Sequence, residues 1–143
     1  MIKKTVVLAV EEGKDEEIIN GLQGMEGFEN IQEWDFFPVN HSDLLNGVTN
    51  PDVMVLSIKL RGGKPNEILK YVKNNFPSTH IVLLVEDDSE QGRNYIRLAK
   101  GMGLKNIVVG NLPGTLPYTL NLAIRFTLEE VEGKKAIVKG STD

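Results

Sequence analysis

Five short apolar runs, each followed by a stretch in which apolar residues recur at helical spacing, constrain the fold of this chain more than any other feature. The runs are rich in Val, Ile and Leu and are mostly apolar, which is typical of strands covered on both faces of a sheet. We predict strands at 5–10, 31–37, 53–58, 81–85 and 107–109. We predict helices at 15–25, in a short stretch after 40, and at 66–76, 89–102 and 118–131. Strands and helices that alternate in this way form a parallel sheet with right-handed crossovers.

The first predicted strand is not followed by a glycine-rich phosphate loop, which disfavours a dinucleotide-binding fold. The pattern therefore predicts an α/β fold of the flavodoxin-like (βα)5 type, a three-layer sandwich around a parallel five-stranded sheet of order 2-1-3-4-5. We expect one domain over residues 1–133. Residues 134–143 form a C-terminal tail with the pattern of a further strand, as at the start of a truncated following domain. Either Asn40 or Ser42 is expected to cap the short second helix.

Charge and residue usage exclude several classes of function. The net charge is −4 and there is no run of lysines or arginines, which argues against nucleic acid as the main partner. The chain has no cysteine, so disulfides, thiolate metal sites and cysteine nucleophiles are excluded. No apolar stretch approaches the roughly 18 residues of a membrane span, so we expect no direct membrane insertion and a cytoplasmic location.

Three short motifs fall in one register along the chain. They are Glu11-Glu12 after the first strand, Pro51–Leu56 at the third strand, and Ala99 with Gly103 before the fifth strand. Together with the order and lengths of the elements, they make residues 4–131 resemble the receiver domain of bacterial response regulators. In that family an acidic pair after the first strand binds magnesium, and a Pro-Asp segment leads to the phosphoacceptor.

The resemblance implies that the phosphorylation chemistry of receivers is lost in this chain. The position of the phosphoacceptor aspartate falls on Ser57, and that of the hydroxyl that senses the phosphate falls on Val85. In receivers a lysine after the fifth strand pairs with the phosphorylated carboxylate, and its position falls on Gly110. The position of the aromatic switch residue in the fifth strand falls on Ile107. These four residues make a degenerate phosphoacceptor site, and the chain is similar to an atypical or pseudo-receiver.

The chemistry of these residues leads to the same expectation. A serine hydroxyl without a general base is a poor nucleophile at neutral pH, and neither His41 nor His80 is expected near Ser57. Magnesium prefers several hard oxygen ligands, so Glu11 and Glu12 alone would bind it weakly at most. We therefore expect no catalytic residue, no dedicated metal site and no resident cofactor.

A second acidic group, Glu86-Asp87-Asp88, follows the fourth strand and faces the same edge of the sheet. Ligands of such folds gather at this edge, so these residues form a candidate acidic rim. The alternative, which we favour, is a charged loop that complements the dipole of the following helix.

The last predicted helix carries two apolar stripes. One faces the sheet and comprises Leu116, Leu120, Ala123, Ile124, Leu128 and Val131. The other recurs every fourth residue on a different face and comprises Tyr118, Leu122 and Phe126. A second apolar stripe indicates an interface, although burial beneath a neighbouring loop or the tail is an alternative. The resemblance implies a homodimer through the fourth helix, fifth strand and fifth helix.

Three functions remain open at this point. The first is a protein-interaction domain that is not an enzyme and acts without phosphorylation, by dimerising or by docking a protein partner. Its tail is similar to the strand that follows a degenerate receiver in the pilus-assembly ATPases of the tight-adherence type, which implies a role in localising such an ATPase. The second is a signalling receiver that still responds through Ser57 or through a ligand at the acidic rim. The third is a small flavodoxin-like enzyme or cofactor binder, which the acidic loop after the first strand disfavours because flavin phosphate needs uncharged donors.

Overall fold

The computed structural model describes residues 4–24, 33–87, 89–109 and 116–131, with side chains of the last range described from residue 122 onward. Its strands are β1 (Lys4–Ala9), β2 (Trp34–Pro38), β3 (Val53–Ser57), β4 (His80–Val85) and β5 (Asn106–Val109). Its α-helices are α1 (Lys14–Gln23), α2 (Pro65–Asn75), α3 (Glu90–Gly101) and α4 (Leu116–Val131). A 3-10 helix, η2 (Ser42–Gly47), connects β2 to β3.

The five strands form one parallel sheet of order β2-β1-β3-β4-β5, which confirms the predicted flavodoxin-like fold. Predicted and observed boundaries agree within a few residues at the described ends. The predicted ends at Met25 and Ile31 lie outside the described residues. Each strand runs in the same direction, so the loops that follow the strands meet at one edge of the sheet, here called the carboxyl edge.

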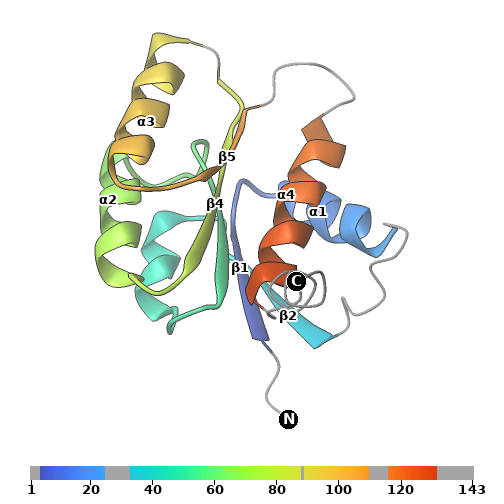
Figure 1. Cartoon of the computed structure of the whole chain (residues 1–143). Helices are drawn as coiled ribbons and strands as arrows, with labels where there is room; N and C mark the ends of the chain where they lie inside the picture. The colour runs from blue at the N-terminus through green and yellow to red at the C-terminus, as the bar shows by residue number, and fades with distance from the viewer. Residues whose placement is uncertain (1–3, 25–32, 88, 110–115, 132–143) are drawn as a thin grey trace, which may run out of the picture.

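Helices cover both faces of the sheet (Figure 1). On one face, α1 and α4 pack over alternate strand residues; this layer contains Ile18, Leu22, Ile124 and Leu128 above Val6, Leu8, Val53, Val55, Val82 and Leu84. On the other face, η2, α2 and α3 pack over the intervening residues; this layer contains Leu45, Leu69, Val72, Tyr95 and Ala99 above Val7, Ala9, Met54, Leu56, Leu83 and Val85. The period-two alternation of strand side chains therefore divides the core into two halves, as both-sided burial requires.

The cap of the second helix differs from our expectation of Asn40 or Ser42. The cap is His41, whose Nδ1 accepts a hydrogen bond of 3.1 Å from the Asp43 N–H. Asn40 instead uses its side-chain amide to donate to the Val10 carbonyl, 2.9 Å away. Ser42 is already helical, and its N–H donates to the Arg61 carbonyl at 2.8 Å. Tertiary contacts of the two flanking residues thus leave the capping position to the histidine between them.

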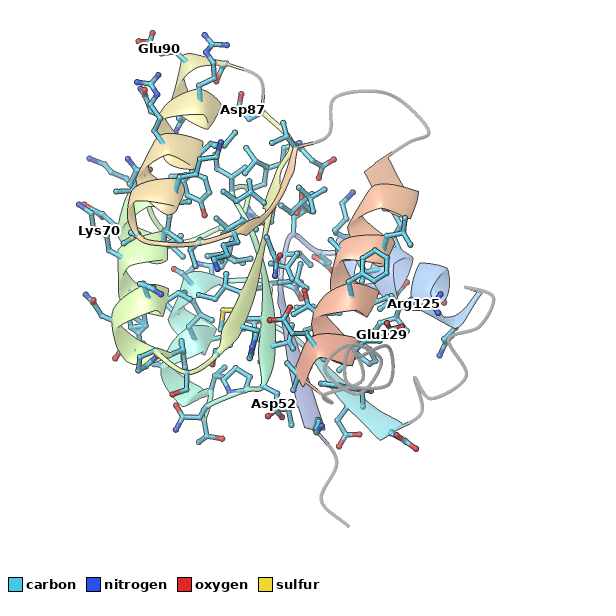
Figure 2. All side chains as sticks on the ribbon, viewed as in Figure 1. Asp52, Lys70, Asp87, Glu90, Arg125 and Glu129 are labelled. Atoms are coloured by element: carbon cyan, nitrogen blue, oxygen red, sulfur yellow. The ribbon has the colours of Figure 1, made fainter. Side chains whose placement is uncertain are left out.

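Asp52 ties three strands together at the amino edge of the sheet, the edge opposite the carboxyl edge. Its Oδ2 accepts from the Thr5 N–H at 2.9 Å, and its own N–H donates to the Thr5 carbonyl at 3.1 Å. Its carbonyl accepts from the His80 N–H at 3.0 Å. Figure 2 shows Asp52 at the lower end of the sheet, far from Asp87 at the upper end. Asp52 of the Pro-Asp segment therefore joins the starts of β1, β3 and β4 by hydrogen bonds at the amino edge.

No helix in the described part of the chain is both long enough and apolar enough to cross a membrane.

Candidate functional site at the carboxyl edge

Ser57 ends β3, the central strand of the sheet, and its side chain is committed to the turn that follows. The residue is 2% exposed, and its Oγ accepts a hydrogen bond of 3.0 Å from the Lys59 N–H. Neither histidine is placed to activate it, because His41 caps η2 through Nδ1 and His80 begins β4 at the amino edge. A buried hydroxyl that serves as a turn acceptor has no feature of an activated nucleophile.

The other residues of the predicted degenerate phosphoacceptor site are apolar where the structure describes them. Val85 ends β4 and is fully buried in the half of the core beneath α2 and α3. Ile107 lies in β5 and packs against the same half of the core. Gly110 lies outside the described residues. The side chains of Val85 and Ile107 have no hydrogen-bond donor to offer an anion.

An ion pair that sequence reasoning missed joins the two loops on either side of the end of β3. The Lys14 Nζ, at the start of α1, lies 3.5 Å from Glu86 Oε1, directly after β4. The two side chains are only 15% and 17% exposed. Because β3 lies between β1 and β4 in the sheet, this pair spans the strand that ends at Ser57. The one sequence signal was a lysine at the start of α1 in an otherwise acidic loop.

The electrostatics of this pair favour a charged lysine. Burial lowers the pKa of Lys14, but the negative charges of Glu86 and Glu17 outweigh that effect, so the pKa lies above its ordinary value of 10.5. Glu17 Oε2 lies 3.5 Å from the same Nζ on its exposed side. At these distances the contacts are ion pairs, and Glu86 Oε1 has no hydrogen-bond partner within the described residues. Lys14 therefore supplies a largely buried cation at this edge, and Glu86 and Glu17 neutralise it.

The acidic pair Glu11-Glu12 does not make a magnesium site in this structure. Glu11 is half-buried, with Oε1 enclosed and without a hydrogen-bond partner in the described part of the chain, whereas Glu12 is exposed. The described residues contain no group of three His, Cys, Asp or Glu side chains that could hold a metal ion. Glu86, a further carboxylate of the same edge, is already paired with Lys14. These donors do not fit the several hard oxygens that magnesium requires.

The described residues of the acidic rim, Glu86 and Asp87, already interact with other groups of the protein. Asp87 Oδ1 accepts from the Ser89 N–H at 2.8 Å, and Ser89 Oγ caps α3 by accepting from the Gly92 N–H at 3.4 Å. Hydrogen bonds from Ser89 hold the pKa of Asp87 below its ordinary value, with a smaller contribution from the charges of Lys59 and Arg93. Figure 2 shows Asp87 beside the start of α3, where Glu90 begins the helix. Asp88 lies outside the described residues. The contacts of Glu86 and Asp87 support the interpretation of a charged loop that leads into a helix.

A groove between β5 and α4 is a further candidate surface, and two of the residues that line it are exposed apolar side chains. Its volume is about 570 Å³, and it is lined by Lys105, Asn106, Ile107, Val108, Val109, Ala123, Phe126, Thr127 and Glu130. Phe126 is 46% exposed and Val109 is 51% exposed, both large values for apolar side chains. Leu122 is half-buried, and the side chain of Tyr118 lies outside the described residues. On the sheet side of the helix, Ile124 and Leu128 are fully buried, while the side chains of Leu116 and Leu120 lie outside the described part of the structure.

Sequence reasoning identified Phe126 but missed Val109 and the groove itself. The missed signal was that β5 is an edge strand with an apolar final residue, because one side of an edge strand is open to a partner.

Comparisons with known proteins show which solved structures share this fold. No protein-family model matches the chain, and no curated protein matches it. Solved structures match over nearly its whole length. One is the BeF3-activated receiver domain of DrrB, with 21% identity, a TM-score of 0.62, and coverage of 90% of this chain and 99% of that domain. The fold is that of a response-regulator receiver domain.

Two further receiver structures agree with this assignment. The phosphorylated cyanobacterial phytochrome response regulator RcpA matches with a TM-score of 0.67 at 15% identity, covering 90% of this chain and 96% of its own. The receiver domain of a putative Luxo repressor protein from Vibrio parahaemolyticus matches with a TM-score of 0.65 at 14% identity, covering 95% and 98%. At such identities the match establishes the receiver fold, and the chemistry rests on the residues present at the carboxyl edge.

Proposed function

We propose that this chain is a phosphorylation-independent, receiver-like regulatory domain that acts by contact with other proteins and is not an enzyme. The observation that carries the proposal is the Lys14–Glu86 ion pair, which spans the end of β3 above a buried serine. Phosphoryl transfer to a receiver needs a carboxylate nucleophile, a bound cation and donors for the phosphoryl oxygens. Here Ser57 stands at the position of the nucleophile, and the largely buried cation of Lys14 is paired with the carboxylate of Glu86.

The first prediction concerns phosphorylation itself. Incubation with a small phosphodonor and magnesium should leave the intact mass of the chain unchanged, whereas an active receiver treated in parallel gains one phosphate. A stoichiometric adduct would contradict the proposal. It would support the alternative of a signalling receiver, and mapping of the adduct would show whether Ser57 or the acidic rim carries it.

Contact through the β5–α4 groove is the second part of the proposal. Phe126 and Val109 present two large apolar side chains at the edge of the sheet, and contiguous exposed apolar area is uncommon on monomers. A twofold contact between copies would cover both residues in each copy and the open edge of β5. We therefore propose a homodimer through α3, β5 and α4.

The second prediction tests this dimer with a matched pair of variants. Phe126→Glu should give a monomer in sedimentation velocity because a carboxylate would be buried at the interface. Leu44→Glu should remain dimeric, since Leu44 is 58% exposed on η2, in the opposite helical layer. A parent chain that is monomeric at every concentration, or equal masses for both variants, would reject this interface.

We also propose a cellular setting for the domain, in which it precedes a tight-adherence pilus-assembly ATPase in the cytoplasm and serves to localise it. Support comes from the strand-like pattern of residues 134–143. The reading frame beyond Asp143 tests this proposal directly. A strand followed by Gly-Lys-Ser or Gly-Lys-Thr is expected, and a stop codon or an unrelated domain would refute it.

A further inference from the structure

Charge is strongly segregated along this chain although its net charge is small. Residues 59–105 contain nine lysines and arginines against five acidic residues. Residues 1–58 contain three lysines against eleven acidic residues. The net value of −4 therefore hides a basic segment and a more strongly acidic one. Their placement in the fold decides whether this segregation produces charged faces.

The fold places the basic segment on one outer layer. α2 and α3 lie side by side on the same face of the sheet, and Figure 2 shows Lys70 on α2 extending away from the sheet. On α3, Arg97 and Lys100 are exposed and stand three residues apart, so they are neighbours on the helix surface. Glu67 and Glu90 lie in the first turns of these helices, which leaves the later turns basic. We call this surface the basic face.

The opposite layer carries the acidic residues. Glu12, Glu16 and Glu17 are exposed on α1 and the loop before it, on the other side of the sheet from α2 and α3 (Figure 1). Glu17 shares Lys14 with Glu86, whereas Glu12 and Glu16 have no ion pair with a described residue. These residues form an acidic face, and the molecule carries opposite charges on its two helical layers.

The chemistry of the basic face favours a protein carboxylate partner over nucleic acid. Single-stranded nucleic acid binds through aromatic stacking as well as charge. In the described basic face, however, Tyr95 is buried within α3 and Tyr71 is half-buried with its hydroxyl donating to Asn46 Oδ1 at 2.8 Å. A second copy of this chain supplies an exposed carboxylate surface of opposite charge, on α1 and the loop before it. Like faces repel, so the charge distribution favours an arrangement in which the basic face of one copy meets the acidic face of the next.

We propose that copies of this domain associate head to tail, with the α2–α3 basic face of one copy against the α1 acidic face of its neighbour. Such a contact uses two different surfaces and leaves one of each unoccupied at the ends, so it extends into a chain of molecules. It does not use the β5–α4 groove, which would join copies by a twofold contact, although both proposed contacts involve α3. Exposed ion pairs are individually weak, so the association is expected at high protein concentration and low salt.

The test uses charge reversal in the Phe126→Glu background, which removes the proposed twofold contact. The weight-average mass from sedimentation equilibrium should rise with protein concentration at about 0.01 M ionic strength, where the screening length is roughly 30 Å. It should fall to the monomer value near 1 M, where the screening length is roughly 3 Å. The double variants Arg97→Glu/Lys100→Glu and Glu12→Lys/Glu16→Lys should each remain monomeric at both salt concentrations.

An equimolar mixture of the two double variants provides the control for net charge, because its mean net charge equals that of the parent. Each reversed face finds its complement on the other variant, so the mixture should associate again at low salt. Association of either double variant alone, or failure of the mixture to associate while the parent does, would overturn the proposal. A parent that stays monomeric at low salt in this background would overturn it too, without bearing on the twofold contact.

Discussion

Individual residues at the carboxyl edge are constrained by their neighbours in different ways. Ser57 and Val85 end neighbouring strands and are both buried, yet one hydroxyl is used in a turn and the other side chain fills the core. Gly92 is constrained by its neighbour: a Cβ atom there would collide with the Asp87 carbonyl oxygen, which is backbone and has little freedom to move. The tight loop between β4 and α3 therefore depends on a glycine in the first turn of α3.

A glycine pair in α3 provides the third prediction. Gly92→Ala should lower the free energy of unfolding by about 1–3 kcal/mol, because the added methyl group forces backbone to shift. Gly101→Ala, in the last turn of the same helix, has no atom within 4 Å of the new Cβ and should be neutral or stabilising by up to about 1 kcal/mol. Urea denaturation followed by the fluorescence of Trp34, the single and buried tryptophan, measures both. Equal effects of the two substitutions would contradict the packing argument.

At the scale of elements, the Lys14–Glu86 pair couples the start of α1 to the loop after β4. The fourth prediction is a double-mutant cycle with Lys14→Met and Glu86→Gln. Lys14→Met should cost roughly 1–2 kcal/mol, because it leaves a largely buried carboxylate without its cation. The double variant should recover part of that loss, with a coupling free energy of roughly 0.5–1 kcal/mol. Additive single effects would show that the two loops are energetically independent.

Element existence and order were predictable here, and the reasons are local. Runs such as that of β3 are apolar throughout because both faces are covered, and Ser89 was a recognisable helix start. The cap at His41 was not predictable, because contacts with Val10 and Arg61, both distant in sequence, commit its two neighbours. The groove between β5 and α4 was only half predictable. Helical spacing identified Phe126, and the predicted strand order already put the fifth strand at an edge, whereas the exposure of Val109 depends on how α4 packs beside that strand.

At the scale of the whole molecule, the buried phenol of Tyr95 links stability to pH, which is the fifth prediction. Burial raises the pKa of Tyr95 well above its ordinary value of 10.0. Because the folded state holds this proton more tightly, stability is unaffected below pH 10 and falls as the pH rises above it. The pKa of Lys14 is also raised, from its ordinary value of 10.5. Its stabilising contribution is therefore complete below pH 10.5 and is lost as the pH rises above that value.

The Tyr95→Phe variant separates the two groups. Urea denaturation between pH 9 and 11.5 should show a loss of stability in the parent that is steeper by up to about 1.4 kcal/mol per pH unit than in Tyr95→Phe. If stability falls equally with pH in the parent and in Tyr95→Phe, the phenol does not titrate differently in the folded and unfolded states.

The sequence by itself determined the order of the elements and the parallel sheet. These are local properties, since side-chain type and spacing are read directly from neighbouring positions. Only the tertiary structure decided that Lys14 meets Glu86 across the end of β3, that Phe126 shares a groove with Val109, and that the exposed carboxylates of α1 lie on the opposite side of the sheet from the basic residues of α2 and α3. Each of these depends on distances between residues far apart in the chain, which the packing of helices on the two faces of the sheet establishes.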